Sequence, residues 1–459
     1  MSLLQPADPR PVHFVGIAGA GMSALAELLM RRGIAVTGCD TGSTGADDLE
    51  RLGIRVAHGH DPEHVHAARA LVVTSAMPLH HPELARARAL GITVIRRAEA
   101  LGEAVAVGEV IGIAGTHGKT TTTVMTTEAL AAAGLDPTGV AGGRVGTWQG
   151  NLRAGADRLF VVEADEYDRS FLALSPTVAT VTNIEADHLD IYADLADIRR
   201  AFAQYVGPAR AVVLCADDPG ATTLPTPRGA EVLRYAMESP DARVVARCLR
   251  GLDGGTTFEV VFDGAPVAEV RLRVPGRHNV LNALAAMASG FAVGAAADRM
   301  ALGLERFTGV ERRFQRMGEV GGVTIVDDYA HHPTEIRATL AAARSAFPGR
   351  RIVAAFQPHL YSRTRDFAAE FGEALALADA VFLTEIYPAR ERPIEGVSAG
   401  VVEHAIRASG GALVWRGDRM DLAAALSQSV REGDVVLTIG AGDITKTASE
   451  LLARLTEAP

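Results

Sequence analysis

Lysine is almost absent from this sequence of 459 residues. Of the 45 basic residues, only Lys119 and Lys446 are lysines, so arginine has replaced nearly every other one. Lys119 therefore marks a position where arginine does not serve, and we treat it as a candidate functional residue.

Cysteine is scarce as well. The three cysteines, Cys39, Cys215 and Cys248, are far apart, odd in number and without paired spacing. This pattern indicates neither a disulfide framework nor a zinc site, and it predicts reduced thiols.

The sequence also has no excess of positive charge and no long apolar run. Its formal net charge of -10 gives no general attraction to nucleic acid or to an anionic membrane surface, so local groups must hold any phosphate ligand. The first residues show no basic segment followed by an apolar one, which argues against a secretory signal. The most apolar stretch, residues 280–297, is interrupted by Asn282, Ser289 and two glycines and predicts a buried helix. We expect a cytoplasmic globular protein that binds neither nucleic acid nor membrane.

Three segments share one pattern, an apolar strand that runs into a turn rich in Gly, His or Asp and then into a helix. The first segment begins at residue 12, with a helix expected over 23–32 and a further strand at 34–38. The second begins at residue 109, with a helix that ends near residue 134. The third begins at residue 322, with a helix from about residue 334 and a further strand at 351–356. Such alternation predicts an α/β protein with mainly parallel sheets and with ligands at the carboxyl ends of the strands. Residues 241–275 alternate differently and predict a small antiparallel patch.

Length and pattern together predict three domains. We expect a Rossmann-like domain over residues 1–107, a central P-loop ATPase domain over 108–312 and a second Rossmann-like domain over 313–459.

The turn at Gly115-Thr-His-Gly-Lys-Thr-Thr121 lies between a strand and a helix start, where backbone N–H groups and the helix dipole attract phosphate. In this position Lys119 would contact the β- and γ-phosphates of a nucleotide and Thr120 would offer its hydroxyl to Mg²⁺. The segment departs from the general phosphate-loop pattern, because Ile113 stands where the first glycine is expected. The alternative is a glycine turn with a chance lysine.

Two further apolar strands end in acidic segments. Residues 159–162 lead to Glu163, and residues 178–182 lead through an acidic segment to His188. A divalent metal needs hard oxygen ligands at neighbouring strand ends, so Glu163 and His188 are candidate Mg²⁺ ligands. The alternative for each acid is a helix cap or a solvated turn.

The first glycine turn contains Gly16, Gly19 and Gly21, and Asp40 follows about 20 residues later, as in a dinucleotide fingerprint. A diphosphate would lie at the helix N-terminus and the acid would take a ribose hydroxyl. Either NAD or a nucleotide-diphosphate sugar satisfies this pattern, which is weakened by Ala18 at the second glycine position.

Four histidines, at positions 58, 60, 64 and 66, raise the question of a metal site. No thiol or fixed ligand geometry accompanies them in the sequence, so we interpret the segment as a polar turn between a strand and a helix.

Taken together, the motifs resemble those of the Mur ligase family, and the match covers nearly the whole chain in order. The strings that carry the resemblance are Gly115-Thr-His-Gly-Lys-Thr, Glu163-Ala-Asp-Glu, Asn183-Ile-Glu-Ala-Asp-His188, Gly276-Arg-His-Asn-Val-Leu-Asn282, Arg312-Arg-Phe and Asp327-Asp-Tyr-Ala-His-His-Pro333. The resemblance implies a nucleotide-sugar domain, a central ATPase and a C-terminal domain that closes over the site. It further implies ATP and Mg²⁺ as cofactors, UDP-N-acetylmuramate and L-alanine as substrates, and an acyl phosphate as the intermediate.

The resemblance also assigns residues to these ligands. The ATP loop comprises Gly115, Thr116, His117, Gly118, Lys119, Thr120 and Thr121, with Thr120, Glu163 and His188 as metal ligands. Further nucleotide contacts are Asn279, Asn282, Arg313 and Asp328. The implied substrate contacts are Gly16, Gly19, Gly21, Asp40, Ser75, Tyr329, His331 and Arg363. Among these, Arg363 resembles the receptor of the amino acid's carboxylate and His331 is a candidate base, so the implied catalytic residues are Lys119, Glu163, His188, His331 and Arg363.

The sequence departs from the family pattern at Ala18, Tyr167 and Leu360, where relatives commonly carry glycine, serine and arginine. Relatives that use a carbamylated lysine for a second magnesium have no counterpart here, because no lysine lies between Lys119 and Lys446. We therefore expect Lys446 at the surface or in the C-terminal domain, and other ligands or phosphate oxygens around any second metal.

Three other functions remain open at this point. A ligase of the same family could attach a preformed tripeptide to the same sugar, an oxidoreductase could use NAD at the first turn, or a sensor could bind ATP without turnover. The sequence also leaves open whether the protein is a monomer or a homodimer.

Overall fold

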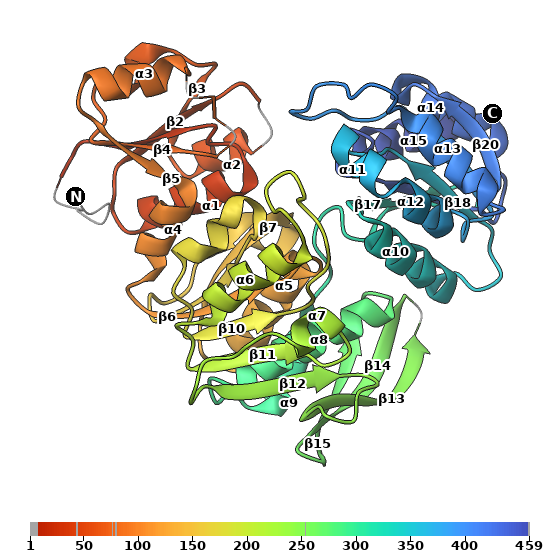
Figure 1. Cartoon of the computed structure of the whole chain (residues 1–459), viewed down its shortest axis with the longest axis horizontal. Coiled ribbons are helices and arrows are strands. Elements are labelled where there is room, and N and C mark those ends of the chain that lie inside the picture. The colour runs from red at the N-terminus through yellow and green to blue at the C-terminus, as the bar shows by residue number, and fades with distance from the viewer. Residues whose placement is uncertain (1–7, 43–44, 76, 79, 253, 458–459) are drawn as a thin grey trace. The chain divides into compact units, whose positions relative to one another are not determined.

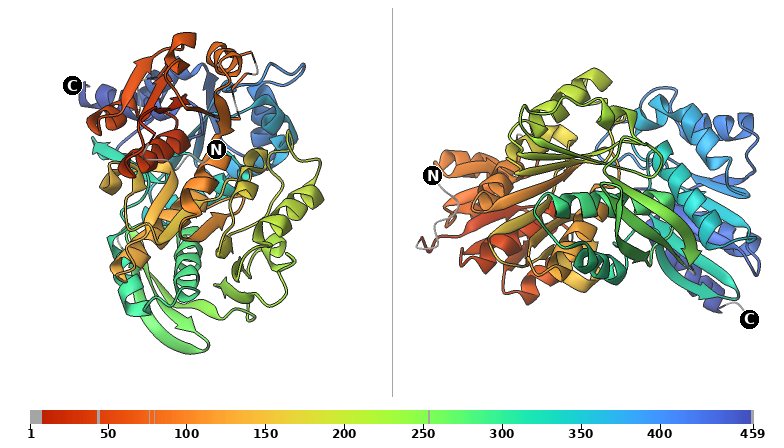
Figure 2. Two further views of the ribbon diagram at one scale, coloured as in Figure 1. Left: turned by 90° about the vertical axis from the view of Figure 1, so that its left-hand side faces the viewer. Right: turned by 90° about the horizontal axis from the view of Figure 1, so that it is seen from below.

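The computed structural model describes residues 8–42, 45–75, 77–78, 80–252 and 254–457, whose strands form three sheets flanked by helices (Figures 1 and 2). The chain divides into two compact units. The first unit comprises residues 1–247, 258–270 and 281–307, and the second comprises residues 248–257, 271–280 and 308–459.

The N-terminal sheet has five strands in the order β3-β2-β1-β4-β5, and its paired strands are all parallel. Its elements are β1 (Val12–Val15), α1 (Ala20–Arg31), β2 (Val36–Asp40), α2 (Ala46–Arg51), β3 (Arg55–His58), η1 (Pro62–Val65), β4 (Ala70–Val73), α3 (Pro82–Ala89), β5 (Thr93–Arg96) and α4 (Arg97–Val105). The strand order reverses at β1, which has β2 on one side and β4 on the other. A crevice for ligands is expected at the carboxyl ends of β1 and β4, where the chain leaves the sheet in opposite directions.

The second sheet has ten strands in the order β15-β14-β13-β12-β11-β10-β6-β9-β7-β8. Its elements begin with β6 (Glu109–Ala114), α5 (Lys119–Ala132), β7 (Thr138–Val145), η2 (Gly146–Trp148), β8 (Gly150–Arg153), β9 (Leu159–Glu163), η3 (Tyr167–Ala173) and β10 (Val178–Val181). They continue with α6 (Leu195–Val206), β11 (Ala211–Cys215), α7 (Pro219–Thr222) and β12 (Glu231–Ala236). Strand β6 pairs in parallel with β9 and β10, so the segments that follow these three strands meet at one edge of the sheet.

The predicted antiparallel patch is confirmed in the strands β13 (Val244–Leu252), β14 (Gly255–Phe262) and β15 (Ala265–Leu272). They are neighbours in the sheet, and two-residue connections of this length join only antiparallel strands. The predicted buried helix is confirmed over residues 280–291, which lie in α8 (Arg277–Phe291), whereas the rest of the apolar stretch leads into α9 (Ala297–Arg306).

The C-terminal sheet has six strands in the order β16-β17-β21-β18-β19-β20. Its elements are β16 (Gln315–Val320), β17 (Val323–Asp328), α10 (Pro333–Ala346), β18 (Ile352–Phe356), α11 (Tyr361–Asp366), α12 (Ala368–Leu375), β19 (Ala380–Thr384), α13 (Ala399–Ala408), β20 (Leu413–Gly417), α14 (Arg419–Ser429), β21 (Val435–Ile439) and α15 (Thr445–Glu457). Only the edge strand β16 pairs in an antiparallel manner; the other pairs are parallel.

The parallel strands are nearly continuous apolar runs because helices cover them. All five residues of β11, β18, β19 and β21 are buried, for example. Within the described part of the chain, no helix combines the length and the apolar character needed to cross a bilayer.

Candidate functional site

The turn between β6 and α5 depends on two glycines. Gly115 and Gly118 have φ angles of +140° and +80°, which L side chains rarely adopt. A Cβ atom at Gly115 would lie 1.9 Å from Oγ1 of Thr182, and one at Gly118 would lie 2.6 Å from Oδ1 of Asn282. The backbone therefore approaches its neighbours too closely for any other residue at these two positions.

Hydrogen bonds from the segment after β10 hold the same turn in place. Asn183 accepts a bond from the His117 amide (2.7 Å) and donates to the His117 carbonyl (3.1 Å), while Thr182 Oγ1 also donates to that carbonyl (2.6 Å). The Thr116 hydroxyl accepts a bond from the Glu185 amide (2.9 Å). The turn is thus rigid before any ligand binds, a condition for stabilising charge in a transition state.

Lys119 begins helix α5 and folds its ammonium group back over the turn. Its Nζ donates to the carbonyl oxygens of Gly115 (2.8 Å) and Thr116 (3.2 Å) and lies 2.8 Å from Oε2 of Glu166. Burial alone would lower the pKa of Lys119, but the charges of Glu166 and Asp165 outweigh it and raise the pKa. The ammonium group is therefore charged and fixed at the N-terminus of a helix that no side chain caps.

Glu166 is a residue that the sequence reasoning did not single out. It is 2% exposed, it pairs with Lys119, and its Oε1 lies 3.6 Å from Nε2 of His188. Burial raises its pKa to about 7, although the charge of Lys119 acts in the opposite direction. The only sequence signal for Glu166 was its position in the acidic segment after β9. That position does not distinguish the roles of Glu163 and Glu166.

Thr120 and Glu163 place two oxygen atoms at a spacing that suits Mg²⁺. Thr120 Oγ1 donates to Oε1 of Glu163 at 2.9 Å. Adjacent oxygen ligands of an octahedral Mg²⁺ lie about 2.9 Å apart, since each Mg–O distance is about 2.1 Å. The other oxygen of Glu163 accepts a hydrogen bond from the backbone amide of Gly142 (2.5 Å). Burial raises the pKa of the Glu163 carboxyl group. A divalent cation would offset that burial, so these two residues fit the ion.

His188, the third predicted metal ligand, follows β10 in a left-handed backbone conformation with φ of +53°. Its Nε2 faces Glu166 (3.6 Å) and Asp187 (3.8 Å), and the ring of Tyr167 packs edge-on against its imidazole with centroids 5.1 Å apart. Carboxylate neighbours orient an imidazole for metal binding. The structure thus brings Lys119, Thr120, Glu163 and His188 to the carboxyl edge of one sheet.

Asn279 and Asn282 both lie on helix α8 and both are buried. The Asn282 Oδ1 accepts a bond from the Thr122 hydroxyl (3.2 Å) on helix α5, next to the turn, and the Asn279 amide donates to the carbonyl of Pro275 (2.7 Å). Asn282 therefore belongs to the surroundings of the phosphate turn.

Gly16 and Gly19 lie in the turn after β1, Gly21 lies at the start of α1, and Ser75 is exposed after β4. Both segments lie at the reversal point of the strand order, as ligand-binding segments of this fold do. The Asp40 carboxylate accepts backbone N–H groups of Ala18 (2.9 Å) and Gly42 (2.8 Å) and so orders the turn directly.

Arg97 is the second residue that the sequence reasoning missed. A Cβ atom at Gly21 would lie 2.9 Å from Nη1 of Arg97, so the guanidinium group lies against the first turn of α1. That helix starts at the uncapped Gly19 and has no acidic residue in its first turn. A helix N-terminus together with an arginine forms an anion site.

In the second unit, the predicted residues cluster after β17. The Asp328 carboxylate accepts the amides of Phe314 (2.8 Å) and Ala330 (2.7 Å), and burial raises its pKa to about 6 against the opposing charge of Arg313. The guanidinium groups of Arg312 and Arg313 lie 4.9 and 5.1 Å from the ring centroid of Tyr329. Tyr329 thus orients two cations.

His331 and Arg363 lie at the carboxyl ends of β17 and β18. The Nδ1 of His331 is 3.0 Å from the Tyr329 carbonyl oxygen and 3.4 Å from Oε2 of Glu335. Arg363 is 5% exposed, on helix α11, with Nη1 3.5 Å from Nδ1 of His359, and the ring centroids of His331 and His359 are 6.1 Å apart. His359 therefore connects the two predicted residues.

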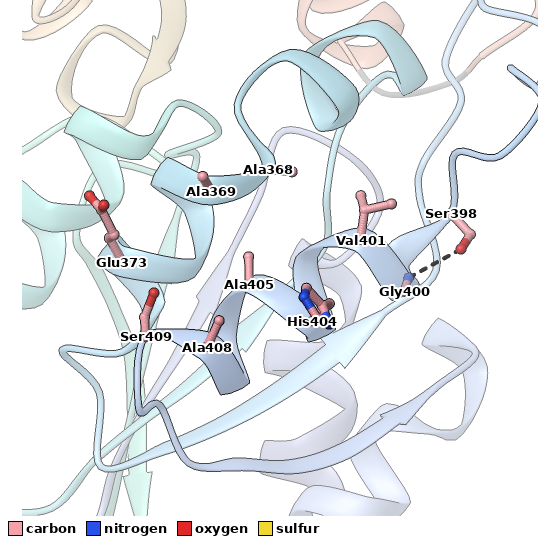
Figure 3. A pocket seen from close by; sticks show the side chains of 10 residues that line it. All are labelled: Ala368, Ala369, Glu373, Ser398, Gly400, Val401, His404, Ala405, Ala408 and Ser409. Atoms are coloured by element: carbon pink, nitrogen blue, oxygen red, sulfur yellow. Dashed lines mark hydrogen bonds between the residues drawn. The ribbon is translucent and has the colours of Figure 1, made fainter.

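Lys446 is exposed on helix α15, in agreement with the expectation from the sequence. Figure 3 shows a surface hollow between helices α12 and α13, where the amide of Gly400 donates to Oγ of Ser398 at 3.2 Å. None of the predicted site residues lines this hollow.

Comparison with known proteins identifies the family. Three family profiles match the chain in succession: "Mur ligase family, catalytic domain" over residues 11–108, "Mur ligase middle domain" over 113–290, and "Mur ligase, glutamate ligase domain" over 312–442.

Curated relatives match over almost their full lengths. A protein of Salinibacter ruber named UDP-N-acetylmuramate--L-alanine ligase is 45% identical over 98% of this chain and 95% of its own, and one of Kineococcus radiotolerans with the same name is 46% identical over 97% and 96%.

Among solved structures, the UDP-N-acetylmuramate-alanine ligase of Thermotoga maritima superposes with a TM-score of 0.84 at 29% identity, covering 98% of this chain and all of the other. A murein peptide ligase of Psychrobacter arcticus gives a TM-score of 0.72 at 26% identity, covering 98% and 99%. The chain, with its three sheets and its glycine turn between β6 and α5, belongs to the Mur ligase family.

Proposed function

We propose that this chain joins L-alanine to the lactyl carboxylate of UDP-N-acetylmuramate, using ATP and Mg²⁺ and passing through an acyl phosphate. Relatives about 45% identical over nearly the whole chain carry the name of this activity. The observation that carries the proposal is the buried ammonium group of Lys119, held at the N-terminus of α5 beside the Thr120–Glu163 pair. We further propose a cytoplasmic location, where ATP is available.

The first chemical step follows from the charge of the reactants. An amine does not attack a carboxylate at a useful rate, because the negative charge repels it and oxide is a poor leaving group. A carboxylate oxygen therefore takes the γ-phosphoryl group of ATP, and the bond between that phosphorus and the β-phosphate oxygen breaks. Lys119 holds the phosphates in line for this transfer and offsets their charge. Bound Mg²⁺, held by Thr120, Glu163 and His188, supplies further neutralisation of the phosphate charge.

In the second step the neutral amine of alanine attacks the acyl carbon, and phosphate leaves as the amide forms. We assign the alanine carboxylate to Arg363 and the ammonium proton to His331, whose Nδ1 side faces Glu335. A bidentate guanidinium is suited to a carboxylate, and its burial in α11 limits its freedom.

The proposal is tested by phosphate release from the purified protein with UDP-N-acetylmuramate, ATP and Mg²⁺. Alanine, serine, glycine or the tripeptide L-alanyl-γ-D-glutamyl-meso-diaminopimelate is offered as the amine. We expect release with alanine to exceed release with each of the other amines. Likeness to the murein peptide ligase supports the tripeptide alternative, and faster release with the tripeptide would establish it instead. No release with any amine would leave the ATP-sensor function.

Arg97→Ala is expected to raise the KM for UDP-N-acetylmuramate by about tenfold or more, since charge-assisted hydrogen bonds contribute about 1.5–3 kcal/mol. The guanidinium lies at the first turn of α1, where the diphosphate of the sugar nucleotide would bind. The KM for ATP should stay within about twofold of the wild-type value.

The matched control is Arg96→Ala, because Arg96 precedes Arg97 in the chain and is exposed. Equal effects of the two substitutions on the KM for the sugar nucleotide would show that Arg97 has no particular role in binding it.

A further inference from the structure

Side chains that commonly bind transition metals lie together on one face of the N-terminal sheet. They are His13 on β1, Cys39 on β2, His64 on η1 and Glu83 on α3, and one donor atom from each lies within 4.8 Å of all the others. His60, between β3 and η1, has its Nδ1 3.3 Å from Sγ of Cys39. None of these residues has a part in the proposed reaction.

The expectation that no thiol accompanies the histidines at 58–66 is therefore wrong. The segment is a polar turn between β3 and η1, as predicted, but sheet pairing brings Cys39 to it. His13 pairs with Thr37 and Val15 pairs with Cys39 in the parallel register of β1 and β2, so His13, Val15 and Cys39 face the same side. Helices η1 and α3 contribute Val65 and Leu84 to the apolar cluster on that side of the sheet.

The distances between the donor atoms suit one tetrahedral ion. Cys39 Sγ lies 3.2 Å from both carboxylate oxygens of Glu83, and Nδ1 of His64 lies 2.9 Å from Oε1 of Glu83. Ligands of Zn²⁺ lie about 3.3–3.5 Å apart, because Zn–N and Zn–O bonds are about 2.0–2.1 Å and Zn–S bonds are about 2.3 Å. All four donor atoms lie within 4.8 Å of one another, so movement of the side chains toward a common centre would complete the coordination.

The second observation is a buried nitrogen atom without a partner. His13 is 2% exposed, and its Nδ1 lies 2.9 Å from Oγ1 of Thr37. Its Nε2 makes no hydrogen bond in the described part of the chain. A ring oriented through one nitrogen by an outer partner, with the other nitrogen left available, is the usual arrangement of a metal-binding histidine.

Glu83 is fully buried, and its ion-pair partners in the described structure are two imidazoles, His64 (2.9 Å) and His60 (3.9 Å). A buried carboxylate requires a compensating charge. A hydrogen-bonded network without metal, in which the Cys39 thiol and His64 donate to Glu83, would satisfy three of the side chains. It would still leave Nε2 of His13 unpaired.

We propose that His13 Nε2, Cys39 Sγ, His64 Nδ1 and a Glu83 oxygen form a structural Zn²⁺ site. When the ion binds, an S–Zn bond forms, the thiol proton is released to solvent, and the ion gives up its bound water. No oxidation state changes. Four protein ligands leave no open position, which is typical of a structural site, and the side chains of His60 and His64, 26% and 25% exposed, provide a path for entry.

The site would stabilise the neighbouring glycine turn. Cys39 immediately precedes Asp40, and its carbonyl oxygen accepts the amides of Gly16 (2.8 Å) and Ile17 (3.1 Å). An ion bound to Cys39 would therefore also restrain the carbonyl group that holds the turn after β1 in place.

The test uses the full-length protein, stripped of metal with a chelator and titrated with Zn²⁺ against a chromophoric competitor at neutral pH. We expect binding of one ion per chain. Cys39→Ser should weaken it by at least about 100-fold, and Thr37→Val, which removes the outer partner of His13, by about 10–100-fold. Cys215→Ser is the matched control, because Cys215 is a free cysteine that is also buried, and it should bind Zn²⁺ as the wild type does.

Titration with Co²⁺ gives a second readout, because a thiolate ligand produces a charge-transfer absorption band. The band should be present in the wild type and in Cys215→Ser and absent in Cys39→Ser. If Cys39→Ser does not fold, His64→Gln replaces it, with a loss of Zn²⁺ affinity as the expected result. Absence of stoichiometric binding by the wild type, or equal affinity of the ligand variants and the control, would overturn the proposal.

Discussion

Lys119→Met is expected to lower kcat/KM for ATP-dependent phosphate release by about 100- to 1,000-fold, or roughly 3–4 kcal/mol of transition-state stabilisation. Methionine has a similar length but no charge, so the phosphoryl group would lose the cation at the tip of α5. The loss should fall mainly on kcat, because negative charge is redistributed toward the β-phosphate as the phosphoryl group leaves. Initial rates over a range of ATP concentrations measure both constants.

Lys119→Arg should also be strongly impaired. The ammonium group fits between the carbonyls of Gly115 and Thr116 and the carboxylate of Glu166, a space that a planar guanidinium does not match. Lys446→Met is the control, since it removes the other lysine of the chain from an exposed helix and should retain wild-type rates. Wild-type kcat/KM in Lys119→Met would refute the proposed role of the turn.

In the metal-free protein, the contribution of Glu166 to the free energy of unfolding is expected to fall as the pH rises from about 4.5 to about 7. Burial raises the pKa of Glu166 from 4.5 to about 7 in the folded state, so the folded chain binds more protons than the unfolded chain within this window. The stabilisation is complete below pH 4.5 and is lost as the pH passes through 7. A shift of this size corresponds to a contribution on the order of 3 kcal/mol to the free energy of unfolding.

Urea unfolding in the presence of EDTA, at a series of pH values, measures this contribution. Glu166→Gln cannot ionise, so the difference in unfolding free energy between the wild type and this variant should change across the window by about the contribution of Glu166. Glu50→Gln, a substitution at an exposed carboxylate of α2 in the same unit, should keep the wild-type dependence. Parallel curves for the wild type and Glu166→Gln would contradict the assignment.

Local sequence patterns predicted most of the fold correctly. The strands, turns and helices that begin at residues 12, 109 and 322 are confirmed, and so are the antiparallel strands over 244–272. The boundaries were less accurate: α1 begins at Ala20 and not at residue 23, because helical geometry starts directly after Gly19. Apolar periodicity shows which part of a helix is buried. The first residues of a helix that follows a glycine turn have no such periodicity, so the sequence does not show where the helix begins.

The sequence places the proposed site residues together where they are consecutive, and it does so less well where they come together through the sheet. Residues Gly115–Thr121 follow one another through a turn and the first residues of α5, so the sequence alone brings these side chains together. Glu166, Arg97 and the cluster around Glu83 depend on which strands are neighbours and on which face each side chain lies. Strand order and burial are properties of the folded chain that no single motif encodes.

The two lysines differ in a way that bears on chemical handling of the protein. Lys446 is exposed, whereas the side chain of Lys119 is 14% exposed, protonated and bound by three acceptors. Amine acylation requires an accessible, unprotonated nitrogen, so among the lysines Lys446 reacts first. The protein can therefore be tethered to a bead or labelled through the Lys446 side chain without modification of Lys119, the group that we propose holds the nucleotide.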